Sequence, residues 1–217
     1  MGKGAKMAFS HEELYQDLVV REGITVCYKD EHWWWRVLGQ QLCENFVTTL
    51  GTTVYFPSRE WVKRSFHWAW VVICQEAVHV EAYRRHGFMF YVLYCFPQWL
   101  GLLALLSPLL WSWWPLAFLV FLAPWPAPWR YQFELRAYAM GLAVEHWYHR
   151  RGVPPSLRDM VVSQLSGSTY YFMWPFEGAV TRDIGRWSKR ILCNETDGDG
   201  DVFRRIRLLV TLRRALS

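Results

Sequence analysis

Gln75, Glu76 and His79 have the clearest chemical potential in this chain, because they fall within five consecutive residues, Gln75-Glu76-Ala77-Val78-His79. On a helix, side chains at positions i and i+4 face the same way, so residues 75 and 79 can reach one metal ion. A glutamate beside the first ligand position can act as a general base on metal-bound water. The amide oxygen of Gln75 is, however, a much poorer zinc donor than imidazole. We therefore expect any zinc binding here to be weakened by orders of magnitude.

Regular elements are predicted on both sides of this segment. Residues 61–85 lack Gly and Pro and are predicted to form one helix that carries Glu76 and His79. The segment 48–56 is rich in β-branched and aromatic residues around Gly51, which predicts a hairpin or a bent strand. Further elements are predicted as a helix at 10–20 with Ser10 as its cap, a short strand at 24–28, a helix at 131–150 and another from Ser156.

Three segments together resemble small HExxH proteins of bacteria and tailed phages, a zinc-metallopeptidase-like group of the gluzincin type. They are residues 52–57, which match an edge strand, residues 75–87, which match the metal helix and its Arg-rich end, and residues 133–138, which match a later helix. The resemblance covers roughly residues 48–146. The phage members also share an apolar insertion and a Tyr-Phe-Met-Trp-Pro segment, which lies near Trp174 in this chain.

The resemblance implies a role for each matching position. Glu76 matches the general base, His79 a metal ligand and Glu134 the third ligand, with zinc as the metal. Gln75 stands where the family has its first metal histidine, so a working site is in doubt. His67 lies too far along the predicted helix to join His79 on one ion. Whether His146 and His149 fold back toward the site, or are packed or surface histidines, is left open by the sequence.

An apolar insertion follows the predicted metal helix. Residues 88–129 contain no charged side chain, and their length is about twice that of one bilayer-spanning helix. Two alternatives remain open: a helical hairpin in a membrane, or an aromatic hairpin buried against protein. The prolines within the insertion favour a short, kinked hairpin over straight spans. Since the chain has 15 tryptophans, which collect at interfaces, we expect membrane or partner contact through Trp99, Trp111, Trp113, Trp114 and Phe118.

Charge and cysteine content restrict the remaining function classes. The net charge of +5 includes a basic C-terminus, but no nucleic-acid-binding motif accompanies it, so a nucleic-acid partner is not expected. The five cysteines are widely spaced and form no CxxC pair, which favours a reducing compartment over a disulfide framework. The N-terminal residues have no apolar core of a secretory signal, so we expect the protein in the cytoplasm of the producing cell, and then in a virion or at the cytoplasmic membrane.

These observations predict a predominantly helical α+β protein, with residues 1–217 as one peptidase-like domain and 88–129 as an apolar helical hairpin inserted in it. The favoured hypothesis is a pseudoenzyme, a degenerate metallopeptidase-like protein with a structural or interaction role in a phage virion or a membrane-attached assembly. It would contact other proteins, further copies of itself or lipid through the hairpin. One alternative is an active zinc metallopeptidase with Glu76 as general base. Another is a membrane-inserted protein without metal, in which Glu76 and His79 pair in the interior.

Overall fold

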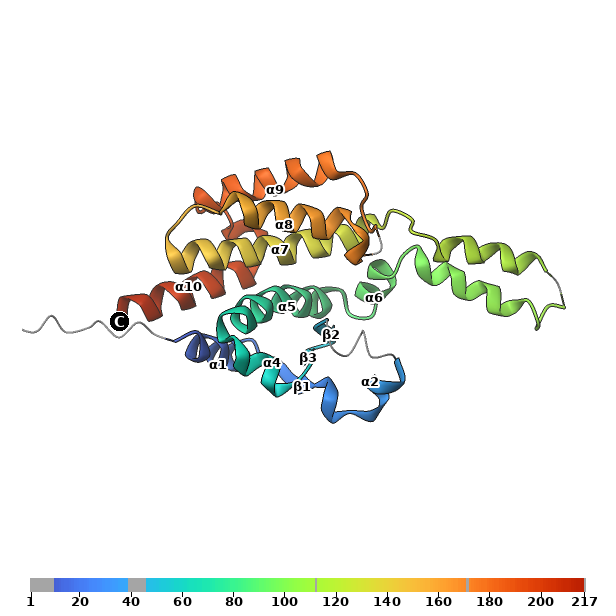
Figure 1. Ribbon diagram of the computed structural model, residues 1–217, viewed down its shortest axis with the longest axis horizontal. Helices are drawn as coiled ribbons and strands as arrows, with labels where there is room; N and C mark the ends of the chain where they lie inside the picture. Colours follow the sequence, from blue (N-terminus) through green and yellow to red (C-terminus); the bar gives the residue numbers. More distant parts are fainter. Residues whose placement is uncertain (1–9, 39–45, 112, 171, 217) are drawn as a thin grey trace, which may run out of the picture.

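The computed structural model describes residues 10–38, 46–111, 113–170 and 172–216 (Figure 1). Most of the described residues are helical, and one small sheet completes the predicted α+β class. Helix α1 spans His11–Arg21 and begins with the predicted cap. The Glu13 N–H donates to the Ser10 hydroxyl at 3.2 Å, and the Ser10 N–H donates to the Glu13 carboxylate at 3.4 Å. This reciprocal pair satisfies two N–H groups that an α-helix otherwise leaves free.

The sheet has three strands, β1 (Thr25–Tyr28), β2 (Thr48–Leu50) and β3 (Thr53–Phe56). Strand β3 lies in the centre, parallel to β1 and antiparallel to β2, so β2 forms an edge of the sheet. The predicted hairpin at 48–56 is confirmed, with Gly51 at a φ of 65° in the turn, where glycine is favoured. Between β1 and β2 lie the 3-10 helix η1 (Lys29–Glu31) and the helix α2 (Trp33–Leu38).

The helix predicted at 61–85 is divided in two, α4 (Arg59–Arg64) and α5 (Phe66–His86). Ser65 separates them with an extended backbone, and its hydroxyl accepts a hydrogen bond from the Trp68 N–H at the start of α5. Helix α7 (Pro128–His149) packs along α5. Contacts between His79 and Glu134 near one end, and between His67 and Glu145 near the other, show that the two helices are antiparallel.

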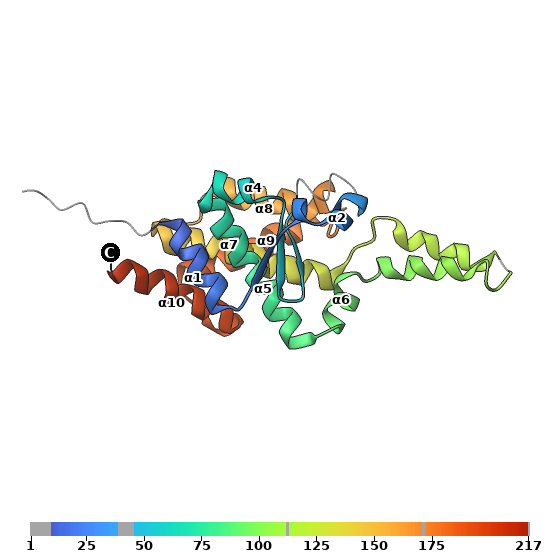
Figure 2. The ribbon, with the colours of Figure 1, turned by 90° about the horizontal axis from the view of Figure 1, so that it is seen from below.

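Three further helices, α8 (Pro155–Ser166), α9 (Glu177–Leu192) and α10 (Asp201–Leu216), cover α7 on the side away from the sheet and at its flank (Figures 1 and 2). The short 3-10 helices η4 (Ser168–Tyr170) and η5 (Asp197–Asp199) lie in the connections. One cluster of buried apolar side chains runs from α1 to α10. The basic C-terminal helix packs partly on α1, since Arg205 binds the carboxylate of Glu22 through two hydrogen bonds of 2.7 and 2.8 Å.

The apolar insertion projects from the body of the molecule (Figures 1 and 2). Its first helix, α6 (Met89–Tyr94), still packs against α5 and α7, and the projecting part consists of two 3-10 helices that pack on each other, η2 (Gln98–Leu106) and η3 (Trp114–Leu122). The long helical hairpin expected here is therefore not found: each of the two helices has nine residues, with Pro97 before η2, Pro108 between them and Pro124 after η3. Among the described residues, no helix combines the length and the apolar character needed to cross a membrane.

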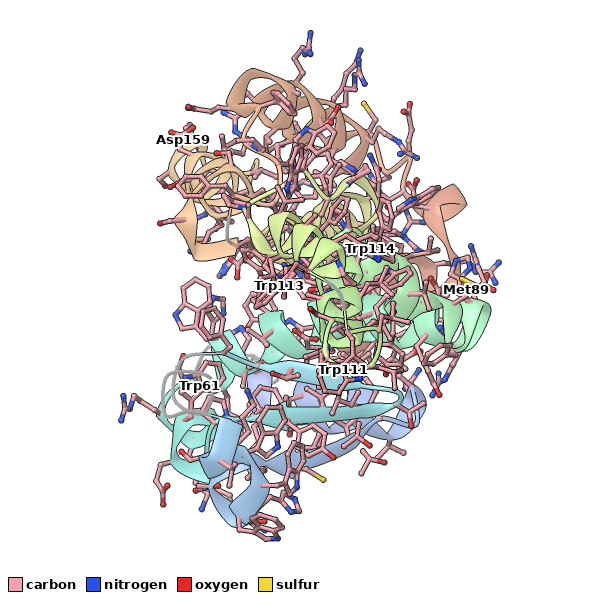
Figure 3. All side chains as sticks on the ribbon, turned by 90° about the vertical axis from the view of Figure 1, so that its right-hand side faces the viewer. Trp61, Met89, Trp111, Trp113, Trp114 and Asp159 are labelled. Atoms are coloured by element: carbon pink, nitrogen blue, oxygen red, sulfur yellow. The ribbon has the colours of Figure 1, made fainter. Side chains whose placement is uncertain are left out.

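The residues expected to make membrane or partner contacts lie on this projection. Figure 3 looks onto it from its free end, with Trp111, Trp113 and Trp114 labelled. The first two side chains are 96% and 84% exposed, and Trp114 is also exposed. Trp99 is less exposed, at 38%. Phe118 is partly covered by contacts with the rings of Trp114 and Phe121.

Candidate functional site

A pocket of about 500 Å³ lies where β2, α5, α6 and the first turns of α7 meet. Glu76, His79 and Glu134, the three residues that the resemblance implicates in chemistry, all line it. The antiparallel packing of α5 and α7 accounts for this convergence, because it places His79 next to Glu134, 55 positions later in the sequence. The rest of the lining comes from residues 46–50, Phe90, Tyr91, Tyr94, Cys95, Arg130 and Tyr170.

His79 and Glu134 face each other across the junction of α5 and α7. Nε2 of His79 lies 3.7 Å from Oε1 of Glu134, and both side chains are largely buried. The hydroxyl of Tyr94 donates a short hydrogen bond to the same carboxylate oxygen. Nδ1 of His79 is buried and meets no hydrogen-bond partner among the described residues. The pair therefore offers one imidazole and one carboxylate to the pocket, with the carboxylate already held by a tyrosine.

Glu76 is held separately, by the edge strand. The Thr49 hydroxyl donates a 2.6 Å hydrogen bond to its carboxylate. Burial raises the pKa of Glu76 above its ordinary value, although His79 and the bond from Thr49 act in the opposite direction. A carboxylate with a raised pKa in a pocket is suited to take up a proton, as a general base must. It can equally serve as a hydrogen-bond donor to a ligand when it is protonated.

Gln75 does not join these residues. Its side chain packs against α7 at Gly141, so closely that a Cβ atom at 141 would lie 2.3 Å from the Gln75 amide nitrogen. It lines a separate cavity of about 30 Å³ between α5, α7 and α8. Because Gly141 has no side chain, the Gln75 amide fits between α5 and α7 at this point. The structure thus brings together the proposed base and two proposed ligands, but not the residue at the first ligand position.

No protein-family model, curated protein or solved structure matches this chain. The resemblance to HExxH proteins therefore stays a prediction from the sequence.

A cationic and aromatic wall completes the pocket, and sequence reasoning did not find it. The guanidinium carbon of Arg130 lies 5.2 Å from the centre of the Tyr94 ring and 5.5 Å from that of Tyr170. Burial opposes the charge on Arg130, but Tyr94 and Glu134 raise its pKa overall. Burial and the nearby Glu134 carboxylate likewise hold the pKa values of Tyr94 and Tyr170 well above the ordinary tyrosine value. Arg130 therefore stays cationic and both tyrosines stay neutral.

A second group of ionisable side chains gathers at the opposite end of the α5–α7 pair. Among the described residues, His67, Glu145 and His149 are the three His, Cys, Asp or Glu side chains whose ligand atoms all lie within 4.8 Å of one another. His149 thus folds back onto His67 and not onto His79. His146 lies outside the group, with its Nδ1 2.6 Å from the Arg151 carbonyl. The sequence signal for this group is the i, i+4 spacing of Glu145 and His149. This spacing alone did not predict the group, because the structure is needed to place His67 opposite these two residues.

Proposed function

We propose that this chain is a metallopeptidase-like pseudoenzyme, which holds an extended polypeptide segment in its pocket without cleaving it. The observation that carries the proposal is the position of Gln75. It is a poor zinc donor by chemistry, and it packs against Gly141 outside the pocket. A catalytic zinc site needs three protein ligands and one open position. The pocket offers His79 and Glu134 as ligands, and Glu76 in the place of the base.

The edge strand supports an extended polypeptide as the occupant. Strand β2 pairs with β3 on one side and lines the pocket with residues 48–50. A sheet edge can add a further strand through main-chain hydrogen bonds, and pockets beside it then select side chains. The pocket wall combines aromatic rings with one cation, Arg130, and one proton-accepting carboxylate, Glu76. Such a wall suits one apolar side chain of a peptide together with a polar or charged group next to it.

The projecting hairpin supports a role within a larger assembly. An exposed apolar surface of this kind is covered in use, by another protein, by a further copy of the chain or by lipid. Together with the resemblance to phage proteins, it favours a structural or interaction component of a virion or of a membrane-attached complex. Replacing Trp111 and Trp113 by serine should reduce self-association, measured by light scattering, and binding to lipid vesicles. If neither property changes, these tryptophans are not the contact surface.

Hydrolysis and zinc content test the pseudoenzyme proposal together. Fluorescently labelled unfolded casein is the probe, with anisotropy reporting binding and fragment release reporting cleavage. His149→Ala is the background for every protein, so that the His67 group does not contribute zinc. We expect binding without cleavage and no zinc that depends on His79. Adding Gln75→His should not by itself create a zinc site in the pocket, because residue 75 packs against Gly141 outside it.

An active zinc metallopeptidase remains a second candidate, favoured by the facing of His79 and Glu134 and by the raised pKa of Glu76. In that case the protein with Gln75 unaltered would cleave casein in a zinc-dependent manner. Glu76→Gln would abolish the cleavage and leave zinc binding in place, because the base is lost and the ligands remain. Cleavage that depends on both zinc and Glu76 would therefore overturn the pseudoenzyme proposal.

A further inference from the structure

The group at the opposite end of α5 and α7 has the composition of a metal site. Nε2 of His67 lies 2.9 Å from Oε1 of Glu145, and Nε2 of His149 lies 3.5 Å from Oε2 of the same carboxylate. Two imidazoles and one carboxylate thus converge from two helices. Oε1 of Glu145 is buried, and among the described residues no hydrogen-bond donor is well aligned with it. A contact of this kind fits two ligands of a common ion, and it also fits an ion pair between Glu145 and a protonated His67.

The separations between these atoms agree with a four-coordinate zinc ion. Zinc bonds to His nitrogen and carboxylate oxygen are about 2.0–2.2 Å long, so neighbouring ligand atoms of a tetrahedral site lie about 3.4 Å apart. The 2.9 Å distance from His67 runs to Oε1 of Glu145 and the 3.5 Å distance from His149 runs to Oε2, and one ligand atom from each of the three residues lies within 4.8 Å of the others. The side chains of His67 and His149 are 31% and 44% exposed, so a fourth position is accessible to water. Two histidines and one carboxylate with an open position form a donor set typical of zinc and of other first-row divalent ions.

His11, the first residue of α1, fixes the orientation of the His67 ring. Its Nε2 lies 3.1 Å from Nδ1 of His67, which leaves Nε2 of His67 free to face Glu145. The His11 ring also packs on Tyr148, with 4.2 Å between ring centres. Metal-binding histidines usually use their second nitrogen in this way, and the hydrogen bond sets the tautomer and the ring direction. The group therefore has an outer partner from a third helix.

We propose that His67, Glu145 and His149 bind a first-row divalent cation, with Zn²⁺ as the expected ion and His11 as the residue that positions His67. The site is separate from the pocket. His67 precedes His79 by twelve residues on α5, which corresponds to about 18 Å along a helix. Binding would join α1, α5 and α7 at the end of the molecule away from the apolar hairpin. The alternative is that Glu145 forms ion pairs with protonated histidines, and this alternative predicts no metal uptake.

The test is zinc binding to the full chain, measured by calorimetric titration with zinc chloride and by elemental mass spectrometry after dialysis. His149→Ala removes one ligand at an exposed position, so the fold should persist. Glu145→Gln keeps the side-chain volume and removes the carboxylate. His146→Ala is the matched control, because it removes a histidine from the same helix turn but outside the group. His79→Ala reports on zinc held in the pocket.

We expect one zinc per chain in the unaltered protein, in His146→Ala and in His79→Ala. Binding should be lost in His149→Ala and in Glu145→Gln. His11→Phe keeps a ring against Tyr148 but removes the hydrogen-bond acceptor, and should weaken binding by about 10–100-fold. The proposal is overturned if the unaltered protein takes up no zinc, or if His149→Ala retains it. It is also overturned if uptake is lost in His79→Ala alone, which would assign the metal to the pocket.

Discussion

Because Gln75 contacts Gly141, the effect of Gly141→Ala on stability should depend on the residue at position 75. In a helix interior, alanine is more favourable than glycine by about 1 kcal/mol. In the unaltered protein, however, a methyl group at 141 would meet the Gln75 amide at 2.3 Å and the rest of that side chain at 3.3–3.5 Å. Overpacking of this kind costs roughly 1–3 kcal/mol. Gly141→Ala should therefore be neutral or destabilising by up to about 2 kcal/mol, because the overpacking opposes the helix propensity.

The same substitution should change sign once Gln75 is shortened. In a Gln75→Ala background the obstacle is gone, and Gly141→Ala should stabilise the protein by about 1 kcal/mol. Urea unfolding of the four proteins, followed by tryptophan fluorescence, gives the coupling energy, which should be about 1–3 kcal/mol. If Gln75 instead faced the pocket, Gly141→Ala would stabilise both backgrounds equally. A coupling near zero would therefore refute the position of Gln75 on which the pseudoenzyme proposal rests.

Three further predictions concern charge and metal. Because burial raises the pKa of Glu76, the folded protein holds this proton more tightly than the unfolded chain, so stability falls as pH rises from the ordinary glutamate value through the raised one. Glu76→Gln should flatten this part of the stability–pH curve in urea unfolding and increase stability at neutral pH. Arg205→Met should cost about 3 kcal/mol in the same assay, because it leaves the buried Glu22 carboxylate unpaired, whereas Arg204→Met on the exposed face should stay within about 0.5 kcal/mol. Zinc at 100 times its dissociation constant should stabilise the unaltered protein by about 2.7 kcal/mol in thermal unfolding, and His149→Ala not at all.

Local signals in the sequence were sufficient for most individual elements. Ser10 and the acidic residues after it predicted the start of α1, and Gly51 between β-branched residues predicted the β2–β3 hairpin. The break at Ser65 was missed, since serine is compatible with a helix interior and its capping bond forms only when the backbone opens there. The prolines of the insertion were recognised as interruptions that favour a kinked hairpin, and membrane-crossing helices were one of two alternatives left open. The structure has short 3-10 helices in their place.

The candidate site was predictable only in part, because its residues come from distant segments. Glu76 and His79 share one helix and could be found by spacing, and Glu134 was found through the resemblance. Arg130 and Tyr94 carry no local pattern, and they enter the pocket because α6 and α7 meet there. The direction of a side chain such as Gln75 depends on what the facing helix leaves open at each turn, and this information is absent from either helix alone.

The insertion begins and ends at the pocket wall, so both of its ends contribute to the candidate site. The cavity is lined by Tyr94 and Cys95, where the chain enters the projection, and by Arg130, where it returns. At the base of the projection, the guanidinium of Arg130 stacks on the Tyr94 ring. Under the proposed function, a docking event at the tryptophan-bearing tip that displaces the insertion would also displace Tyr94 and Arg130, which lie beside Glu134. Thermodynamic reciprocity then requires that an occupant of the pocket changes the affinity of the tip for its proposed partner by the same factor as that partner changes the affinity of the pocket. In the proposed function, capture in the pocket and attachment through the tip would thus be coupled through the insertion.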